Sequence, residues 1–362
     1  MTTKPENYFD DFVTKRSEHA VANGIGTAPE ERECFRYFDR DGDGILNHEE
    51  FHHLCCQLLS SNDDCDQQWT NQDTDKILQL FVKQKEVDEK IFENMWKSWI
   101  KPILRPKSAF LVVDVQNDFI SGSLALKNAP AKQNGEEVVP VINKLIETVE
   151  FDIVIFSHDW HPDNHISFYE NLHSRKLDSA SPITAEVAKQ FDTVVFAGHN
   201  GEPYYRQTLW PKHCIQNSSG AELHTDLQVH KDHIKAYKGM NPEKDNYSVL
   251  NPTPELEPNN NTSGPAWLIK QLKDQDITDL YVCGLALDIC VDYTVLDACQ
   301  LGFRTILVED ACRGLDEKDI MMKTEGMGEA GCLVVTSNEV SDMVSGLVRH
   351  PKLAHSTLRP RA

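Results

Sequence analysis

Residues 109–115, AFLVVDV, form a run of apolar residues interrupted near its end by one carboxylate, Asp114. Such a run, without polar alternation, is typical of a strand covered on both faces of a parallel sheet. Further runs rich in β-branched residues follow at 151–159, 233–238, 279–285, 304–310 and 332–337. Patterns with helical spacing separate them, at 138–149, 265–275, 291–302 and after Ser337. This alternation predicts a doubly wound, mainly parallel α/β sheet with helices on both faces, whose sites lie at the carboxyl ends of the strands.

The first 100 residues show a different pattern. Apolar residues lie three and four apart in EERECFRYF, EEFHHLCCQLL and DKILQLFVKQ, and strand signals are lacking, so we expect a small all-α domain at 1–100. Pro102 and Pro106 break any helix and mark a linker at 101–107. The α/β domain is expected at 108–350, followed by a tail at 351–362. Two polar stretches, 169–209 and 251–263, are expected to be insertions or loops.

The composition narrows the class of protein. With 362 residues, of which 40% are hydrophobic, the chain can bury one large core and a second small one. The formal charge of −21 disfavours nucleic acid and anionic membranes as partners. The N-terminal sequence lacks an apolar signal region, and no stretch reaches the roughly 18 apolar residues that span a bilayer. The ten scattered cysteines are therefore expected to be reduced thiols in a cytoplasmic protein, with nuclear entry left open.

Residues 39–50, DRDGDGILNHEE, match the loop of a calcium-binding EF-hand. This hard cation needs six to eight oxygen ligands, and the glycine at the sixth position, Gly44, lets the chain turn sharply enough to aim them. The alternative is an acidic surface turn. The expected calcium ligands are Asp39, Asp41, Asp43, Ile45, Asn47 and Glu50.

A degenerate second EF-hand is expected at 84–95, because EF-hands usually pair. When residues 84–95 are matched position by position to the loop 39–50, Ile91 takes the position equivalent to Leu46. The segment lacks acidic residues at the first and last loop positions, so it should not bind calcium. An ordinary helix is the alternative.

Three reactive side chains follow separate strand candidates. Asp114 ends the first, Lys238 follows 233–237, and Cys290 lies five residues beyond 279–285, where a helix begins. Each has a plain alternative: a loop cap for Asp114, a solvated charge for Lys238 and an inert buried thiol for Cys290. A thiol at a helix N-terminus is expected to have a lowered pKa. Because the ends of neighbouring strands converge, the three together predict a catalytic site.

The motifs VVDVQNDF, SHDWHP, LWPKHC, YKGMNPEKDNYS and GLALDICV occur in this order and resemble those of nicotinamidases in the isochorismatase-like hydrolase superfamily. The resemblance covers residues 108–340 and leaves out the EF-hand segment. It implies hydrolysis of nicotinamide to nicotinate and ammonia, a step of NAD salvage, through a Cys thioester. It assigns Cys290 as nucleophile, Asp114 as proton acceptor and Lys238 as the group that stabilises charge.

The resemblance also implies how the substrate is held. A cis peptide is expected at Leu285-Ala286, with an oxyanion hole formed by the backbone N–H groups of Ala286 and Cys290. The residues expected to enclose the pyridine ring are Phe119, Trp210 and Tyr247, whose alternative is ordinary core packing.

A divalent transition metal is implied at Asp159, His161 and His213, with zinc favoured and iron or manganese as alternatives. Its expected task is to hold the pyridine nitrogen of nicotinamide. His165 lies nearby and is left unassigned.

Two other functions stay open at this point. The same fold can serve another small amide, although relatives acting on other substrates generally lack this metal set. A calcium sensor built on a retired hydrolase scaffold is a different class, which the presence of Asp114, Lys238 and Cys290 disfavours. The stretch between His161 and Trp210 is longer than in the family, and its residues 175–205 are expected to form a lid, a contact with the EF-hand module or a plain surface insertion. The expected partner is a small-molecule substrate, with a homo-oligomer left open.

Overall fold

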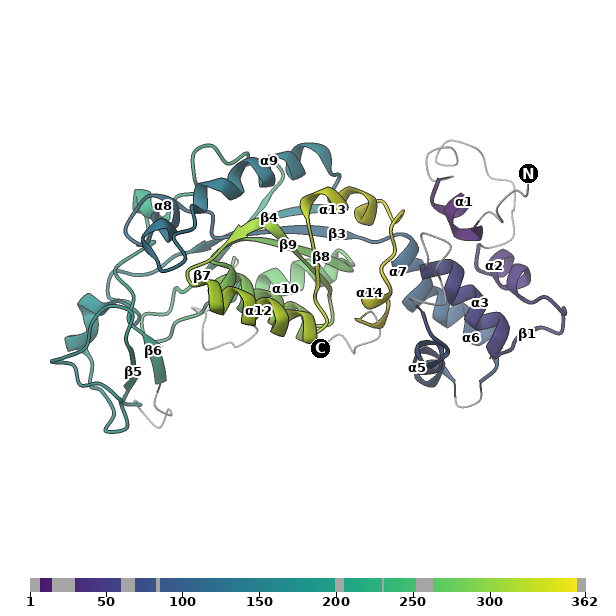
Figure 1. The fold of residues 1–362 in the computed structure, drawn as a ribbon, viewed down its shortest axis with the longest axis horizontal. Coiled ribbons are helices and arrows are strands. Elements are labelled where there is room, and N and C mark those ends of the chain that lie inside the picture. The colour runs from purple at the N-terminus through teal and green to yellow at the C-terminus, as the bar shows by residue number, and fades with distance from the viewer. Residues whose placement is uncertain are drawn as a thin grey trace.

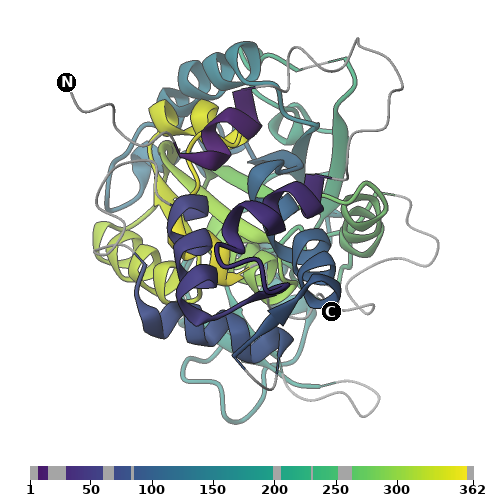
Figure 2. The same ribbon diagram turned by 90° about the vertical axis from the view of Figure 1, so that its right-hand side faces the viewer.

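The computed structural model describes residues 7–14, 30–59, 69–82, 85–198, 205–229, 231–251 and 263–356. Helices formed by the first hundred residues gather at one end of the molecule, beside a parallel sheet with helices on both faces (Figure 1). Viewed from that end, the N-terminal helices lie in front of the sheet (Figure 2). Of the predicted loop 251–263, all but the first and last residue lie outside the described ranges.

The central sheet has six strands in the order β10-β9-β8-β3-β4-β7, and every neighbouring pair is parallel. All six residues of β3 are buried, as expected of a strand covered on both faces. The predicted mainly parallel α/β sheet is therefore confirmed. The strands are β3 (Ser108–Val113), β4 (Ile153–Asp159), β7 (Ile234–Lys238), β8 (Asp279–Leu285), β9 (Arg304–Arg313) and β10 (Leu333–Val335).

Helices cover both faces of this sheet, with α9 and α13 on one side and α10 and α12 on the other (Figure 1). Helix α12 does not follow from the apolar spacing, because Met327 is the one residue it buries and two glycines interrupt it. The helices are α9 (Val138–Thr148), α10 (Pro265–Asp274), α11 (Asp292–Gln300), α12 (Glu317–Glu329) and α13 (Ser337–Val344). Shorter helices lie in the connections: α8 (Asn117–Ile120), η4 (Leu126–Asn128), η5 (Gly135–Glu137), η6 (Tyr169–Ser174), η7 (Ser219–Ala221) and the π-helical turn η9 (Leu287–Val291).

The described residues of 169–209 include a β-hairpin, so this stretch is not made of loop alone, and its reading as an insertion stays a prediction. Strands β5 (Thr193–Phe196) and β6 (Tyr205–Thr208) pair antiparallel, and β5 buries Val194 and Phe196 on one face. These residues belong to a separate small core under the hairpin. The hairpin lies at the end of the molecule opposite the N-terminal helices (Figure 1). Of the three alternatives for this segment, the contact between its described residues and those helices is therefore excluded.

The N-terminal part is mainly helical and has its own core, built around buried aromatic residues such as Phe51, Trp69 and Phe92. Two short strands, β1 (Ile45–Leu46) and β2 (Val87–Asp88), pair antiparallel, which corrects the prediction that this part lacks strands. Leu46 pairs with Val87, so the prediction that Ile91 takes the equivalent position is wrong. The helices are α1 (Tyr8–Thr14), α2 (Glu30–Phe38), α3 (His48–Leu59), α5 (Asn71–Phe81), α6 (Glu89–Met95), the π-helical η3 (Trp96–Ile100) and α7 (Lys101–Leu104).

The predicted break at Pro102 is absent, because helix continues from Glu89 to Leu104 through the π-helical turn. In that turn the N–H of Lys101 bonds to the carbonyl of Trp96, five residues back, and this wider winding accommodates a proline within the helix. The predicted tail also contains a helix, α14 (Pro351–Ser356).

Helix α14 and the segment before it join the two parts of the molecule. Trp99 Nε1 donates to the carbonyl of Ala354 at 3.0 Å. Arg349 is buried and donates to the carbonyl of Leu58 at 2.6 Å and to Asp10 Oδ1 at 2.8 Å. Contacts that far apart in the sequence hold the N-terminal helices against the C-terminal end of the chain.

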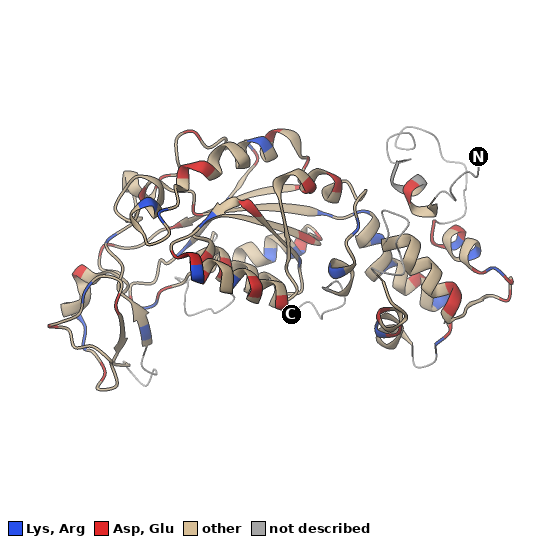
Figure 3. Ribbon diagram, in the orientation of Figure 1, with Lys and Arg blue, Asp and Glu red and all other residues tan. Residues whose placement is uncertain are grey.

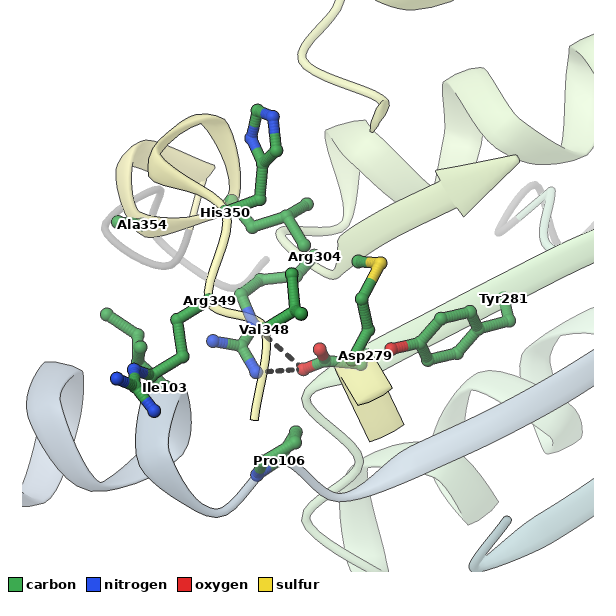
Figure 4. Close-up of a pocket in the computed structure, with 11 residues that line it drawn as sticks. Ile103, Pro106, Asp279, Tyr281, Arg304, Val348, Arg349, His350 and Ala354 are labelled. Atoms are coloured by element: carbon green, nitrogen blue, oxygen red, sulfur yellow. Dashed lines mark hydrogen bonds and ion pairs between the residues drawn. The ribbon is translucent and has the colours of Figure 1, made fainter. Parts of the chain in front are cut away.

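A buried ion pair lies in a small cavity at this junction (Figure 4). Arg304 pairs with Asp279 beside the ring of Tyr281 and also donates to the carbonyl of Pro102 at 2.7 Å. Because both charges are nearly fully buried, each depends on the other for its compensation.

Acidic residues are spread over helices of both parts, including α9, α12 and α13 (Figure 3). No helix among the described residues is long and apolar enough to cross a membrane. Among the described residues eight cysteines form no disulfide, whereas Cys56 is disulfide-bonded, so the expectation of reduced thiols is wrong at Cys56.

Candidate active site

The carboxyl ends of four neighbouring strands carry the reactive side chains. Asp114 follows β3, Asp159 ends β4, Lys238 ends β7, and Cys290 lies in the turn η9 that follows β8. These strands are adjacent in the order β7-β4-β3-β8, so their ends meet at one edge of the sheet. The structure therefore brings the predicted Asp114, Lys238 and Cys290 together.

Lys238 is the centre of this cluster. Its Nζ lies 2.8 Å from Asp114 Oδ2 and 2.5 Å from Asp159 Oδ1, and it donates to Cys290 Sγ at 3.3 Å. The Lys238 and Asp114 side chains are fully buried, and that of Asp159 is 6% exposed. A buried lysine between two carboxylates is compensated electrostatically, which excludes the solvated-charge alternative.

Burial and charge set the protonation of the cluster. Burial opposes the charge of Lys238, but Asp114 and Asp159 raise the pKa of its ammonium well above the usual range. Burial raises the pKa of Asp114, against the opposing effect of Lys238.

Burial also raises the pKa of the Cys290 thiol well above its usual range, and Lys238 counteracts this effect only in part. The prediction of a lowered thiol pKa at the helix N-terminus is therefore wrong. A thiol whose pKa is raised needs a nearby base to become a nucleophile. Carboxylate oxygens of Asp114 and Asp159 and the Cys290 sulfur lie within 4.8 Å of one another.

Asp114 is held by an unusual backbone and by Ser157. Its φ of 48° lies in the left-handed region, which a non-glycine residue rarely adopts. Ser157 Oγ accepts from the backbone N–H of Asp114 at 3.1 Å and donates to its Oδ1 at 2.6 Å. Asp114 Oδ2 is left facing Lys238.

Asp159, His161 and His213 offer a set of possible metal ligands within 4.8 Å of one another. Nε2 of His161 lies 3.3 Å and Nε2 of His213 lies 3.6 Å from Asp159 Oδ2. In each imidazole Nδ1 faces a backbone carbonyl at 2.8 Å, that of Gly239 for His161 and that of Pro211 for His213. A neutral ring that donates from Nδ1 directs the lone pair of Nε2 inward, as metal-ligating histidines do.

This donor set fits a transition metal. Donors held at about 2.0–2.1 Å by one tetrahedral ion are about 3.3–3.4 Å apart, close to the spacing of these atoms. His165 Nε2 is buried beside them without a hydrogen-bond partner, an arrangement that is costly unless another group approaches it. Gly239 keeps the site open, because a Cβ at this residue, whose φ is +68°, would lie 2.3 Å from the His161 ring.

The predicted aromatic residues line the same pocket as the cluster. Phe119, Trp210 and Tyr247 surround it together with Asp159, His213, Ala286 and Cys290. Trp210 Nε1 donates to the Tyr247 hydroxyl at 3.1 Å, which fixes the two rings relative to one another. The Leu285-Ala286 peptide is cis, as expected. The oxyanion hole at Ala286 and Cys290 stays a prediction.

Several pocket residues were not anticipated from the sequence. Gln116 Nε2 donates to the carbonyl of Asp159 at 2.9 Å, and its Oε1 accepts from the Asp159 N–H at 2.8 Å, so this buried amide positions Asp159. It lies two residues after Asp114, directly after the apolar run 109–115, and this position could have pointed to it. The apolar residues of the pocket wall could not be predicted, because they come from connections whose packing depends on the whole fold; they are Leu124, Ile289 and Leu315.

The loop 39–50 forms a second candidate site, far from the first. The oxygens of Asp39, Asp41 and Asp43 lie within 4.8 Å of one another. Glu50 closes the loop, accepting from the N–H of Arg40 at 2.8 Å and from that of Asn47 at 3.1 Å. The loop connects α2 to α3, and its Ile45 belongs to β1.

Comparisons with known proteins show which family the α/β part of the chain matches. The isochorismatase domain model matches residues 108–339. A nicotinamidase of Escherichia coli is 38% identical over 222 residues, covering 58% of this chain and 85% of that protein. A nicotinamidase of Saccharomyces cerevisiae is 30% identical over 223 residues, covering 59% of this chain and 92% of that protein. Among solved structures, an Acinetobacter nicotinamidase/pyrazinamidase has a TM-score of 0.52 at 33% identity, covering 65% of this chain and 98% of that one.

Proposed function

This chain belongs to the isochorismatase family, and from that premise we propose that it is an amidohydrolase converting nicotinamide and water to nicotinate and ammonia, a step of NAD salvage. The observation that carries the proposal is the buried cluster in which Lys238 contacts Asp114, Asp159 and Cys290. Three aromatic side chains around this cluster suit a flat heteroaromatic amide.

In the proposed reaction the Cys290 thiol gives its proton to Asp114 as the sulfur attacks the carboxamide carbon. The C–N bond then breaks, Asp114 returns the proton to the departing amine, and ammonia leaves a thioester on Cys290. Water attacks the thioester, giving nicotinate and restoring the thiol. Lys238 stays protonated and stabilises the negative charge of the carboxylates and of the tetrahedral oxygen, together with the N–H groups of Ala286 and Cys290.

The proposal includes one divalent transition metal, with zinc favoured, held by Asp159, His161 and His213. When bound, the metal supplies a Lewis-acidic site for the pyridine nitrogen and so orients the ring. Within the chain, Gln116 and the carbonyls of Gly239 and Pro211 keep these ligands in place.

The test is ammonia release from nicotinamide by the purified protein and by Cys290→Ala, with metal content measured by elemental analysis. We expect turnover by the wild type and its loss in the variant, at unchanged metal content. An inactive wild type that contains its metal would contradict nicotinamide as substrate and favour another small amide.

We further propose that the N-terminal helices form a calcium-binding EF-hand module, with Ca2+ held by the loop 39–50. The converging carboxylates of Asp39, Asp41 and Asp43 support this site, as does the closing position of Glu50. The loop lies far from Lys238, so we expect Ca2+ to stabilise the module with little effect on turnover. A cytoplasmic location remains part of the proposal.

Thermal unfolding in Ca2+ and in chelator tests this site, with Glu50→Gln and Glu49→Gln as a matched pair. Both variants remove one charge from neighbouring residues, but Glu49 is exposed and occupies no ligand position. At 100 times the Kd, bound Ca2+ stabilises by about 2.7 kcal/mol. We expect the calcium-induced rise in Tm to survive in Glu49→Gln and to vanish in Glu50→Gln, and equal responses would contradict the site.

A further inference from the structure

The catalytic pocket continues outward into a larger chamber that the proposed reaction does not use. This outer chamber has a volume of about 510 Å3, within the range of roughly 300–1,000 Å3 that small-molecule pockets occupy. It shares five lining residues with the inner pocket: Leu124, Trp210, Tyr247, Ile289 and Leu315. A ligand in the inner pocket can therefore extend into it.

Phe191 lines one side of the outer chamber and belongs to the segment 169–209. Its ring packs edge-on against Trp210, with centroids 5.9 Å apart and planes at 81°. The side chain is nevertheless 58% exposed, although a large apolar side chain gains by burial. On the side of the chamber, the Phe191 ring therefore lacks an apolar group that would cover it.

The backbone at Phe191 is strained in a way that serves this position. Its φ is 74°, in the left-handed region that costs a non-glycine residue roughly 1–3 kcal/mol. The N–H of Phe191 donates to the carbonyl of Leu209 at 2.6 Å, and Leu209 donates back to the carbonyl of Asp192 at 2.8 Å. These bonds hold the ring at the chamber, where a glycine would have fitted the backbone without strain.

The walls of the outer chamber define what it can bind. Phe191, Trp210, Tyr247 and Tyr293 supply aromatic faces. The charged residues that line it are all acidic, Asp288, Asp316 and Asp319, with no lysine or arginine among the lining residues. A neutral apolar group fits such walls, whereas a carboxylate would be repelled.

We propose that the outer chamber is a second substrate subsite, in which Phe191 determines specificity for pyridine carboxamides bearing a neutral apolar ring substituent. The inference rests on the proposed function, which places the ring nitrogen at the metal ligands and the carboxamide at Cys290. On that ring C5 is adjacent to neither the nitrogen nor the carbon bearing the carboxamide. A substituent on C5 therefore points away from both, and the space that adjoins the inner pocket for it to enter is the outer chamber.

The test compares nicotinamide, 5-phenylnicotinamide and its para-carboxyphenyl analogue as substrates of the wild type and of Phe191→Gly. Glycine relaxes the strained backbone, so we expect the variant to unfold at the same or a higher temperature. The wild type should have a lower KM for the phenyl compound than for the carboxyphenyl one. In Phe191→Gly the KM of the phenyl compound should rise about two- to tenfold, the value of one aromatic pair, with kcat and the KM of nicotinamide unchanged.

Val187→Gly is the control, because Val187 is an apolar residue of the same segment, 65% exposed and outside the chamber lining. It should leave all three KM values unchanged. Equal KM changes for nicotinamide and the phenyl compound in Phe191→Gly, or none, would overturn the subsite while leaving the proposed function intact. So would a wild type that hydrolyses nicotinamide but not the phenyl compound. A wild type inactive on nicotinamide would overturn the proposed function and this inference with it.

Discussion

At the scale of single residues, the site depends on one buried cation shared by two carboxylates. Lys238 contacts both Asp114 and Asp159, so it neutralises the base that activates Cys290 and a ligand of the candidate metal site at once. Replacing it leaves two buried carboxylates near one another without a counter-charge, a situation far costlier than losing an uncharged group.

Lys238→Met is therefore expected to lower the free energy of unfolding by about 3–5 kcal/mol. Cys290→Ala abolishes activity too, but it removes no charge and should cost only about 1 kcal/mol. Urea unfolding of both variants beside the wild type measures this difference. Equal stability of the two variants would show that Lys238 does not compensate the carboxylates.

The pH dependence of kcat/KM follows from Asp114, which acts as base only when ionised. Burial raises its pKa above the usual 3.8, despite the opposing Lys238. Lowering the pH thus protonates Asp114 and removes the base, so activity should fall on the acid side with an apparent pKa above 3.8. Rates measured from pH 4 to 9 check this, with samples returned to pH 7 to exclude unfolding. A profile that stays flat down to pH 4 would contradict it.

At the scale of elements, the turn after β7 positions the metal ligands. The carbonyl of Gly239 accepts from His161 Nδ1, and the missing Cβ makes room for that ring. Gly326 in α12 is the opposite case, because a Cβ there would meet nothing within 4 Å.

Gly239→Ala is expected to displace His161 and to lower metal affinity about 10- to 100-fold, the usual effect of disturbing a group that orients a ligand. Gly326→Ala should keep the metal and raise stability by about 0.5–1 kcal/mol, as alanine favours a helix interior. Metal content after dialysis against a weak chelator separates the two. Full retention of metal in Gly239→Ala would count against His161 as a ligand.

The elements also show how far sequence reasoning reaches. Strand β8 spans Asp279–Leu285, the bounds expected from its apolar run. A strand buried on both faces is recognisable in the sequence because nearly all of its residues are apolar. Helix α12 and the β5–β6 hairpin were missed, since α12 buries almost nothing and the hairpin packs on a small core of its own. The break expected at Pro102 failed because a π-helical turn absorbs the proline.

For the candidate site, the position of the reactive residues was predictable and their protonation was not. Residues placed at strand ends converge because the topology forces them together, and Asp114, Asp159, Lys238 and Cys290 do so. Their protonation was not predictable, because the burial that raises the Cys290 pKa is a property of the folded chain. The position of Phe191 was not predictable either, since it depends on a left-handed backbone conformation that phenylalanine rarely adopts.

At the scale of the whole molecule, the N-terminal helices and the α/β part are held together by contacts from the C-terminal end of the chain. Arg349 is central, since it donates to the carbonyls of Leu58 and Gly346 and to Asp10. A guanidinium with three partners in a buried position is hard to replace by any other side chain.

Arg349→Ala is expected to destabilise the protein by about 2–4 kcal/mol, because buried carbonyls lose their donor. Arg36→Ala, at an exposed position of α2, should change stability by less than about 0.5 kcal/mol. Chemical unfolding and limited proteolysis compare them, and the first cut in Arg349→Ala should separate the helical part from the sheet. Wild-type resistance of Arg349→Ala would refute the joining role.

The packing of α14 against Trp99 has a consequence for isolating the catalytic half. A fragment that starts at Lys107 would remove the N-terminal core against which Ala354 of α14 packs, together with the acceptors of Arg349 at Leu58 and Asp10. Stopping the same fragment before Arg349 removes that guanidinium but also Leu353, which belongs to the core of the α/β part. The cut at Lys107 in addition takes the carbonyl of Pro102 away from Arg304. The two parts therefore share contacts at both cuts, so neither trimming yields a catalytic half with all of its packing intact.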